Sequence, residues 1–381
     1  MERGFRMVYL DYAATAPMSD EAIRMYGEVA TTYYGNASSL HEAGWYAAQI
    51  LQLTREQIAS ILSVSSDGIY FTGSGTEGNL IAILSIVLGQ KKRQIITTMA
   101  EHTSVHAAMN TLTRWGYEVI KLPLMPCGQI NLEELEMLIT EDTALISVQH
   151  INAEIGVIQP IEAVCEIAKK YQIPVHTDCV QSFGKVPLHD IAKIVDSLTI
   201  SAHKIGGPKG MGAIYIHPKR IIEPLFPGVT HEKGVRGGTV DIPSVAAFSA
   251  ALNQLFTKQD LVKLTQLRYY ILSELRTLPI KVVESSKEQY PGIIGMMAKG
   301  MEGQLMMLEL SEKGFYISTG SACDVEQDEG TKTVLAMGYT PSQARQFFRV
   351  SLHPKNTLEE IEEFVGEMGN IIKKHEFSMN K

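Results

Sequence analysis

Cysteine pairs, long apolar runs and an excess of positive charge are all missing from this sequence. Its 381 residues include four cysteines, Cys127, Cys165, Cys179 and Cys323, and no two of them form a CxxC pair. Isolated thiols in a chain of this length argue against a disulfide framework and against a structural zinc site. We therefore expect no bound metal, and reduced thiols in a cytoplasmic protein.

Membrane and nucleic-acid binding are equally poorly supported. The longest apolar run, around Leu80–Leu88, is shorter than the ~18 residues that a membrane-spanning helix needs. The polar N-terminus, Met1–Met7, contains no apolar core of signal-peptide length. The formal net charge is -8, whereas nucleic acids and anionic membranes attract basic patches. We expect neither a membrane nor a nucleic acid as a direct partner.

Short β-branched runs alternate with amphipathic helical stretches in the first part of the chain. This alternation predicts an α/β fold with a mostly parallel sheet that is covered by helices on both faces. The seven candidate strands are Ile69–Thr72, Gln94–Thr98, Glu118–Leu122, Ala144–Gln149, Pro174–Thr177, Ser197–Ser201 and Ala213–Ile216. Because ligands bind at the carboxyl ends of such strands, the residues that follow each strand are the first candidates for a site.

The pattern changes after about residue 220. A Gly-rich charged segment is followed by one helical stretch, Val245–Leu278, then by a candidate strand, Ile280–Val283, and finally by an acidic helix from Thr357 onward. A chain of this length accommodates roughly two domains, at ~100–200 residues each. We predict a large domain over residues 14–255 and a smaller α+β domain formed by residues 1–13 and 256–381.

A glycine-rich turn lies between the first candidate strand and an apolar helix. In Phe71–Asn79, Gly75 and Thr76 open the helix, so their backbone N–H groups and the positive end of the helix dipole suit a phosphate. An ordinary Gly/Ser turn with a Thr cap is the alternative. The turn is not a P-loop, because no Gly-Lys-Ser/Thr follows the glycines.

Two further candidates follow later strands. Asp178 can pair with a pyridinium nitrogen, although a helix cap or a salt bridge is the commoner role for such a residue. Lys204, before a Gly/Pro-rich turn, becomes a candidate for imine formation if it is desolvated beside a phosphate, and is otherwise a surface lysine. Ser201 and His203 are placed to help hold the phosphate.

These signals occur in the order that fold-type I enzymes dependent on pyridoxal 5'-phosphate (PLP) require. The chain resembles the class V aminotransferase family and, within it, the cysteine desulfurases of the NifS/IscS type. The resemblance covers nearly the whole chain, including the opening motifs Tyr9–Pro17 and Gly35–His41. It implies a PLP-dependent transferase fold with the cofactor attached to Lys204.

The resemblance also implies roles for residues that would not stand out alone. His102 stacks on the pyridine ring and assists proton transfer, Gln181 donates to the phenolate oxygen, and Asn152 belongs to the cofactor site. Thr239, in Arg-Gly-Gly-Thr, reaches the phosphate of a neighbouring subunit, which implies a homodimer. Asn36, in the second opening motif, contributes to the substrate site.

Cys323 and Arg349 carry the resemblance to desulfurases. Cys323 matches the persulfide-forming cysteine, and we expect it on a mobile, exposed loop rather than buried as a structural thiol. Arg349 matches the arginine that clamps the substrate carboxylate, for which a guanidinium fork is well suited. One position departs from the family, because Ala153 stands where an asparagine is usual. Asn152, Gln181 or a water compensates, or substrate binding is weaker.

The implied activity is conversion of L-cysteine to L-alanine, with a persulfide on the enzyme passed to a sulfur-acceptor protein. The acceptor can serve iron–sulfur clusters, thio-cofactors or tRNA thiolation. A selenocysteine lyase and a class V aminotransferase are the alternatives, although the latter has no need of Cys323. A scaffold that retains the fold but lacks PLP is the non-catalytic alternative.

Overall fold

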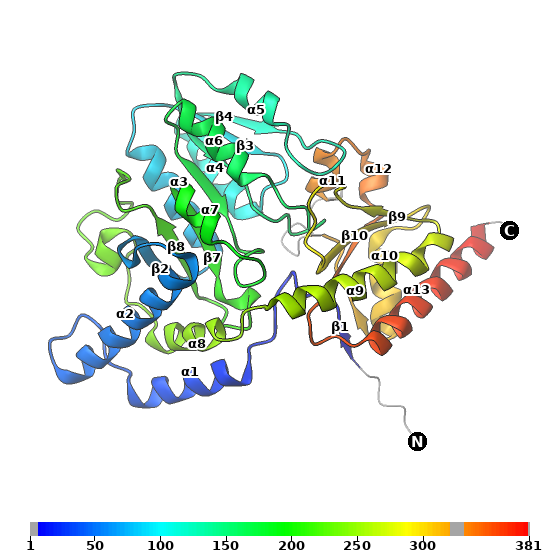
Figure 1. Cartoon of the computed structure of the whole chain (residues 1–381), viewed down its shortest axis with the longest axis horizontal. Coiled ribbons are helices and arrows are strands. Elements are labelled where there is room, and N and C mark those ends of the chain that lie inside the picture. The colour runs from blue at the N-terminus through cyan, green and yellow to red at the C-terminus, as the bar shows by residue number, and fades with distance from the viewer. Residues whose placement is uncertain (1–6, 321–330, 380–381) are drawn as a thin grey trace.

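The computed structural model describes residues 7–320 and 331–379, which form two lobes side by side (Figure 1). The larger lobe is built on a seven-stranded sheet in the order β2-β8-β7-β6-β5-β3-β4. Its strands are β2 (Ile69–Thr72), β3 (Gln94–Thr98), β4 (Glu118–Leu122), β5 (Thr143–Ser147), β6 (Val175–Asp178), β7 (Ser197–Ser201) and β8 (Gly212–Ile216).

The predicted mostly parallel sheet is confirmed. Pairings from β4 through β7 are all parallel, whereas β8 runs antiparallel to both of its neighbours, β7 and β2. Only β8 therefore points the other way. Strand β6 extends one residue further than predicted, so that Asp178 is its last residue rather than the residue after it.

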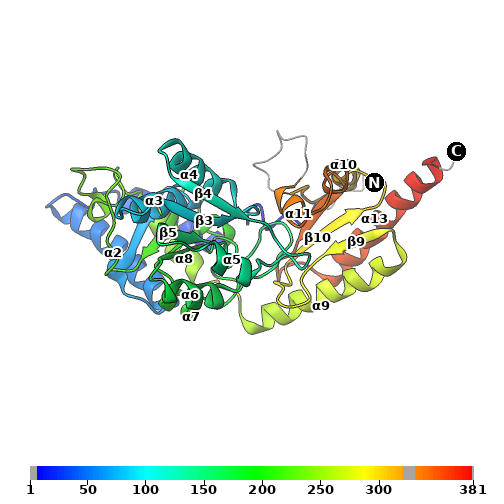
Figure 2. The ribbon, with the colours of Figure 1, turned by 90° about the horizontal axis from the view of Figure 1, so that it is seen from above.

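Helices cover both faces of this sheet (Figure 2). Helices α3 (Gly75–Leu88) and α4 (Thr103–Arg114) share a core with β3 and β5 on one face. The other face is covered by α2 (Glu42–Leu62), α5 (Leu132–Leu138), α6 (Ile161–Lys170), α7 (His189–Ile194) and α8 (Ile242–Leu252). Helix α1 (Asp20–Thr32) packs against α8. A Cβ at Gly78 would come within 2.8 Å of side-chain atoms of Thr199 and Ile214, so glycine lets α3 lie directly on the sheet.

The smaller lobe contains an antiparallel sheet in the order β12-β10-β9. Its strands are β9 (Ile280–Val283), β10 (Ile293–Ala298) and β12 (Phe347–Ser351), packed against α9 (Lys258–Glu274), α10 (Gly303–Glu312) and α13 (Leu358–Met379). Short helices α11 (Lys332–Ala336) and α12 (Pro341–Ala344) precede β12, and β1 (Val8–Tyr9) pairs with β11 (Phe315–Tyr316). The first described strand, β1, thus lies in this lobe, although the predicted domain boundaries stay predictions.

The single helical stretch predicted over Val245–Leu278 is wrong, because the structure has two helices there. Helix α8 ends at Leu252 and α9 starts at Lys258. The second start is specified locally: Thr257 and Asp260 form a capping box, in which each side chain accepts from the backbone of the other residue. The N-cap at Thr257 interrupts a continuous apolar pattern, and this pattern by itself predicts one helix where there are two.

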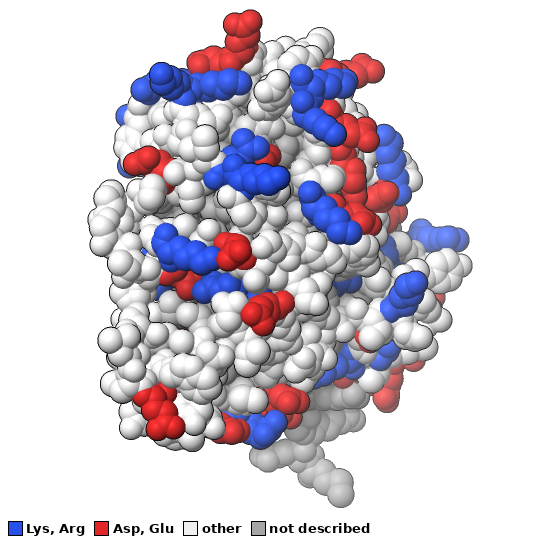
Figure 3. All heavy atoms as spheres, turned by 60° about the vertical axis from the view of Figure 1, so that its left-hand side comes forward, with Lys and Arg blue, Asp and Glu red and all other residues white. Residues whose placement is uncertain are grey.

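The surface of the larger lobe carries charges of both signs. Figure 3 shows basic and acidic side chains interspersed among uncharged ones on the face that comes forward. Exposed ion pairs of the lobe include Arg24–Glu21 and Lys233–Asp67. Within the described part of the chain, no helix is both long and apolar enough to cross a membrane.

Candidate functional site

The three elements predicted to form the site meet where the lobes face each other. Asp178 ends β6, and Lys204 lies in the 3-10 turn η2 (Ala202–Lys204) directly after β7. A Cβ at Gly75 would lie 3.5 Å from the Cβ of Ser201, so α3 begins beside the end of β7. Residues separated by more than a hundred positions therefore share one sheet edge, as the strand-end rule predicts.

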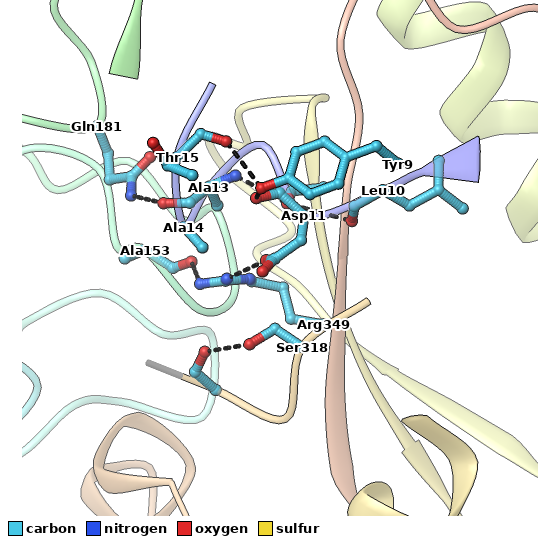
Figure 4. Close-up of polar contacts among 12 residues, drawn as sticks. Tyr9, Leu10, Asp11, Ala13, Ala14, Thr15, Ala153, Gln181, Ser318 and Arg349 are labelled. Carbon is cyan, nitrogen blue, oxygen red and sulfur yellow. Dashed lines mark hydrogen bonds and ion pairs between the residues drawn. The ribbon is translucent and has the colours of Figure 1, made fainter. Parts of the chain in front are cut away.

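The amine of Lys204 is held by the opening segment of the chain. Its Nζ donates to the carbonyl oxygens of Ala13 at 2.5 Å and Ala14 at 2.7 Å. Gln181 Nε2 donates to the same Ala13 oxygen at 2.8 Å, as Figure 4 shows. Tyr9 closes the turn, because its hydroxyl donates to the carbonyls of Asp11 and Thr15. Lys204 and Gln181 thus converge on one backbone oxygen.

Asp178 is a buried carboxylate, 7% exposed, whose hydrogen bonds come from neutral donors. Its Oδ1 accepts from the backbone N–H of Val180 at 2.9 Å and its Oδ2 from Asn79 Nδ2 at 2.7 Å. A buried charge without an opposite charge is costly, so this carboxylate suits a cationic atom of a ligand. The protonated ring nitrogen of PLP is such an atom, and the site fits that cofactor.

The start of α3 fits the phosphate of the same cofactor. Ser74 caps the helix by accepting from the N–H of Glu77 at 3.1 Å, so the N–H groups of Gly75 and Thr76 remain available to an anion. Buried Ser201 lies beside Gly75, and half-buried His203 is two residues further along the chain. Burial, together with the positive charge of Lys204, lowers the pKa of His203 to about 3, so its ring is neutral.

His102 acts as the N-cap of α4. Its Nδ1 accepts from the backbone N–H of Ser104 at 3.2 Å and lies 2.7 Å from the Ser104 hydroxyl. Because Nδ1 accepts a backbone N–H, the neutral ring carries its proton on Nε2. The local capping role and the predicted stacking role are compatible, since the cap uses only one nitrogen.

Arg349, on β12, is buried and held from two sides (Figure 4). Its Nη2 donates to Asp11 Oδ1 at 2.6 Å and its Nη1 to the carbonyl of Ala153 at 2.8 Å. The buried Nε–H has no hydrogen-bond partner among the described residues. The guanidinium has five N–H donors and uses two of them in these bonds, so the remaining donors can bind a carboxylate of a small ligand.

Sequence reasoning missed residues that shape this site, among them Asp11 and Lys185. Asp11 neutralises Arg349 from 338 positions away, and no local signal marks it. Lys185 is buried, and its Nζ donates to Gln181 Oε1 at 3.0 Å. That bond points the amide N–H₂ of Gln181 toward Ala13. Burial, aided by the nearby charges of Lys204 and Arg349, lowers the pKa of Lys185 to about 7.

Lys185 makes the stability of the protein depend on pH in a specific way. Its pKa falls from 10.5 to about 7 on folding, so between these values the unfolded chain binds more protons and stability rises with pH. We expect Lys185→Met to gain most, relative to the wild type, at about pH 6 and less at about pH 9.5. Denaturant unfolding of both proteins across this range measures the difference. A difference independent of pH, as expected for a substitution of exposed Lys209, would contradict the buried assignment.

The other predicted residues are not all brought into this group. Asn36 and Thr239 are exposed, in the α1–α2 turn and after the turn η3 (His231–Gly234), and their roles stay predictions. Asn152 is committed locally: Oδ1 accepts from the N–H groups of Glu154 and Ile155, and Nδ2 donates to Thr333 Oγ1. The Asn152 amide is therefore poorly placed to replace a missing neighbour.

Cys323, predicted to be the persulfide-forming residue, lies outside the described residues. Cys165 and Cys179 are buried, and burial raises the pKa of both thiols to about 12. They are therefore unsuited to thiolate chemistry. In residues 7–320 and 331–379 no group of three or more His, Cys, Asp or Glu side chains could hold a metal ion.

The chain is similar to proteins of known family. A family model described as Aminotransferase class-V matches residues 8–364. A Bacillus subtilis protein named "Putative cysteine desulfurase NifS" is 41% identical, covering 94% of this chain and 93% of its own. "Cysteine desulfurase IscS" of Dictyoglomus turgidum is 34% identical, covering 97% and 95%.

Two solved structures show the same fold. One, described as "NIFS-LIKE PROTEIN", has a TM-score of 0.89 at 32% identity and covers 97% of this chain and 100% of its own. Another, "SspA in complex with cysteine", has a TM-score of 0.81 at 27% identity and covers 92% and 99%. With the family model matching almost end to end and the strand-end site in place, the chain belongs to the class V aminotransferase family.

Proposed function

We propose that this protein is a PLP-dependent cysteine desulfurase, which converts L-cysteine to L-alanine and passes the sulfur through Cys323 to an acceptor protein. The observation that carries the proposal is the buried Asp178 carboxylate with neutral donors, at the same sheet edge as Lys204. The relatives named cysteine desulfurase support the substrate, and the cysteine complex of a structural neighbour agrees with it.

When bound, PLP supplies an electron sink for the α-carbon of the substrate, and Asp178 keeps its ring nitrogen protonated. Arg349 orients the substrate carboxylate through the donors that Asp11 and Ala153 leave unused. Lys204 Nζ is the proton carrier at the α-carbon, and His102 Nε2 assists. The Cys323 thiolate attacks the substrate sulfur: an S–S bond forms, the C–S bond breaks, and its electron pair remains with the carbon skeleton that becomes alanine.

Cys323→Ser tests the sulfur step. We expect loss of alanine and sulfide production, while binding of L-cysteine, followed by the absorption change of the cofactor, is retained, because a hydroxyl cannot form a persulfide. The matched control is Cys127→Ser, which removes another thiol and should retain activity. Full activity of Cys323→Ser would refute the role of Cys323. If Cys323→Ser formed alanine at the wild-type rate from L-selenocysteine but not from L-cysteine, the result would favour a selenocysteine lyase.

Ala153→Asn tests the departure from the family. Ala153 borders a cavity of about 20 Å³ with His102 and Asn152, enough for one water molecule. An asparagine amide there adds a donor, and we expect it to be tolerated and to lower KM for L-cysteine about three- to tenfold. Steady-state kinetics measure the change, with Ala153→Ser as the smaller polar control. An unchanged or raised KM would contradict this expectation.

A homodimer and a cytoplasmic location complete the proposal. The α1–α2 region exposes Ile23, Tyr34, Leu40 and Trp45, and such apolar surface suits a second copy of the chain. In such a dimer, Asn36 and Thr239 of one copy can complete the site of the other copy. The sequence-based reading of reduced thiols supports the cytoplasm.

A scaffold without PLP is the alternative of a different class. The purified cysteine desulfurase should be yellow, and borohydride should attach the cofactor covalently to Lys204. A colourless protein that fails to bind added PLP would favour the scaffold.

A further inference from the structure

A buried hydrogen-bond network lies behind the two residues assigned to the cofactor ring. Asn79 is fully buried in α3, a helix that is otherwise mostly apolar. Its Nδ2 donates to Asp178 Oδ2 at 2.7 Å and to Ser104 Oγ at 2.9 Å. Its Oδ1 lies 3.1 Å from His176 Nε2. One amide therefore contacts both Asp178 and the hydroxyl that contacts His102.

The orientation of the Asn79 amide follows from its partners. A carboxylate only accepts hydrogen bonds, so Asp178 requires the N–H₂ group on its side, and the reversed amide would set two acceptors against each other. The amide oxygen then faces His176, whose Nε2 must carry the proton. Burial lowers the pKa of His176 to about 3, so its ring is neutral, and Nδ1 accepts from Ser197 Oγ at 2.8 Å.

The hydrogen bonds from Asn79 through Ser104 to His102 also have a defined donor and acceptor order. Ser104 Oγ accepts from Asn79, so its own proton is available to His102 Nδ1 at 2.7 Å. The backbone N–H of Ser104 donates to the same nitrogen at 3.2 Å. Both donors require an unprotonated Nδ1, which leaves the His102 proton on Nε2. Every bond from His176 to His102 then has one donor and one acceptor.

We infer that Asn79 is a positioning residue that couples Asp178 to His102. It holds the Asp178 carboxylate in place and, by fixing the direction of the Ser104 hydroxyl, reinforces the backbone N–H of Ser104 in keeping the His102 proton on Nε2. The inference rests on the proposed function and deepens it, because these residues are the ones assigned to the ring nitrogen and the ring face of PLP. A single buried amide thus sets the geometry of Asp178 and biases the tautomer of His102.

Histidine tautomers give a readout that needs no turnover. In the full-length, cofactor-loaded protein with ¹⁵N-labelled histidine, we expect His102 and His176 each to carry the proton on Nε2. Asn79→Leu should give a tautomer mixture at His176 and weaken PLP binding about tenfold or more, because Asp178 loses a buried donor. It should also raise the share of His102 that is protonated on Nδ1, because the Ser104 hydroxyl is then free to accept a hydrogen bond, although the backbone N–H of Ser104 remains. Ser104→Ala should raise the same share at His102 and leave His176 unchanged.

Ser85→Ala is the matched control, since it changes another buried side chain of α3 whose hydroxyl has no hydrogen-bond partner among the described residues. A wild-type His102 protonated on Nδ1 would overturn the inference, as would an Asn79→Leu protein that behaves like the control. If Asn79→Leu does not fold, an unchanged His102 tautomer in Ser104→Ala overturns it instead. A wild-type protein that binds no PLP would count against the proposed function. The tautomers of its His102 and His176 would still test the hydrogen-bond network independently.

Discussion

Lys204→Ala is expected to lower the rate of alanine formation from L-cysteine by on the order of 10³-fold or more. A positioned proton carrier alone contributes ~10²–10⁴-fold, and this lysine is also the attachment point of the cofactor. The structure strengthens the expectation, because the Nζ atom is already aimed by the carbonyls of Ala13 and Ala14. The measurement is steady-state alanine production, with mass spectrometry after borohydride treatment to locate attached cofactor.

Lys209→Ala is the matched control for this prediction. Lys209 is exposed in the same glycine-rich turn, so its loss removes one positive charge without touching the amine site. We expect near wild-type turnover and cofactor still attached to Lys204. If Lys204→Ala retained covalently attached cofactor, or if both variants lost activity equally, the assignment of Lys204 would have to be abandoned.

Arg349→Met is expected to raise KM for L-cysteine on the order of 10²-fold. Charged hydrogen bonds to a carboxylate contribute ~1.5–3 kcal/mol, and the methionine offers none. The substitution also leaves Asp11 partly buried without its cation, which costs about 3–5 kcal/mol of stability. Steady-state kinetics and denaturant unfolding measure the two effects.

The control for this prediction is another buried arginine of the smaller lobe. Arg268 is 7% exposed, pairs with Glu284 and donates to the carbonyl of Ile293. Arg268→Met should lower stability while leaving KM for L-cysteine unchanged. The same rise in KM in both variants would show that Arg349 acts through stability and not through the substrate carboxylate.

The sheet of the larger lobe was largely predictable, because each strand is a short β-branched run bounded by helical periodicity. Strands β2, β3, β4 and β7 have the predicted bounds. Helix α5 starts after an asparagine cap, since Asn131 Oδ1 accepts from the N–H groups of Glu133 and Glu134. The helix break between α8 and α9 was missed, because an amphipathic pattern continues across it while the capping box is a signal of only four residues.

The candidate site divides in the same way. Gly75, Asp178 and Lys204 were found because each lies at or just after the carboxyl end of a strand, and the order of the strands brings these ends together. Asp11, Lys185 and Asn79 carry no such signal. Asp11 reaches Arg349 only because β1 pairs with β11 and lies beside β12. Asn79 is an ordinary helix residue until packing of α3 on the sheet places it against Asp178.

By itself, then, the sequence determined the α/β architecture, the strand-end residues and the family resemblance, since these depend on local periodicity and on motifs of a few residues. Only the tertiary structure decided which charges compensate each other, which amide orientation and histidine tautomer the buried network requires, and how burial lowers the pKa of Lys185 to about 7. Such properties depend on burial and on distances between residues far apart in the chain, and hydrogen bonds and charges act strongly only where water is excluded.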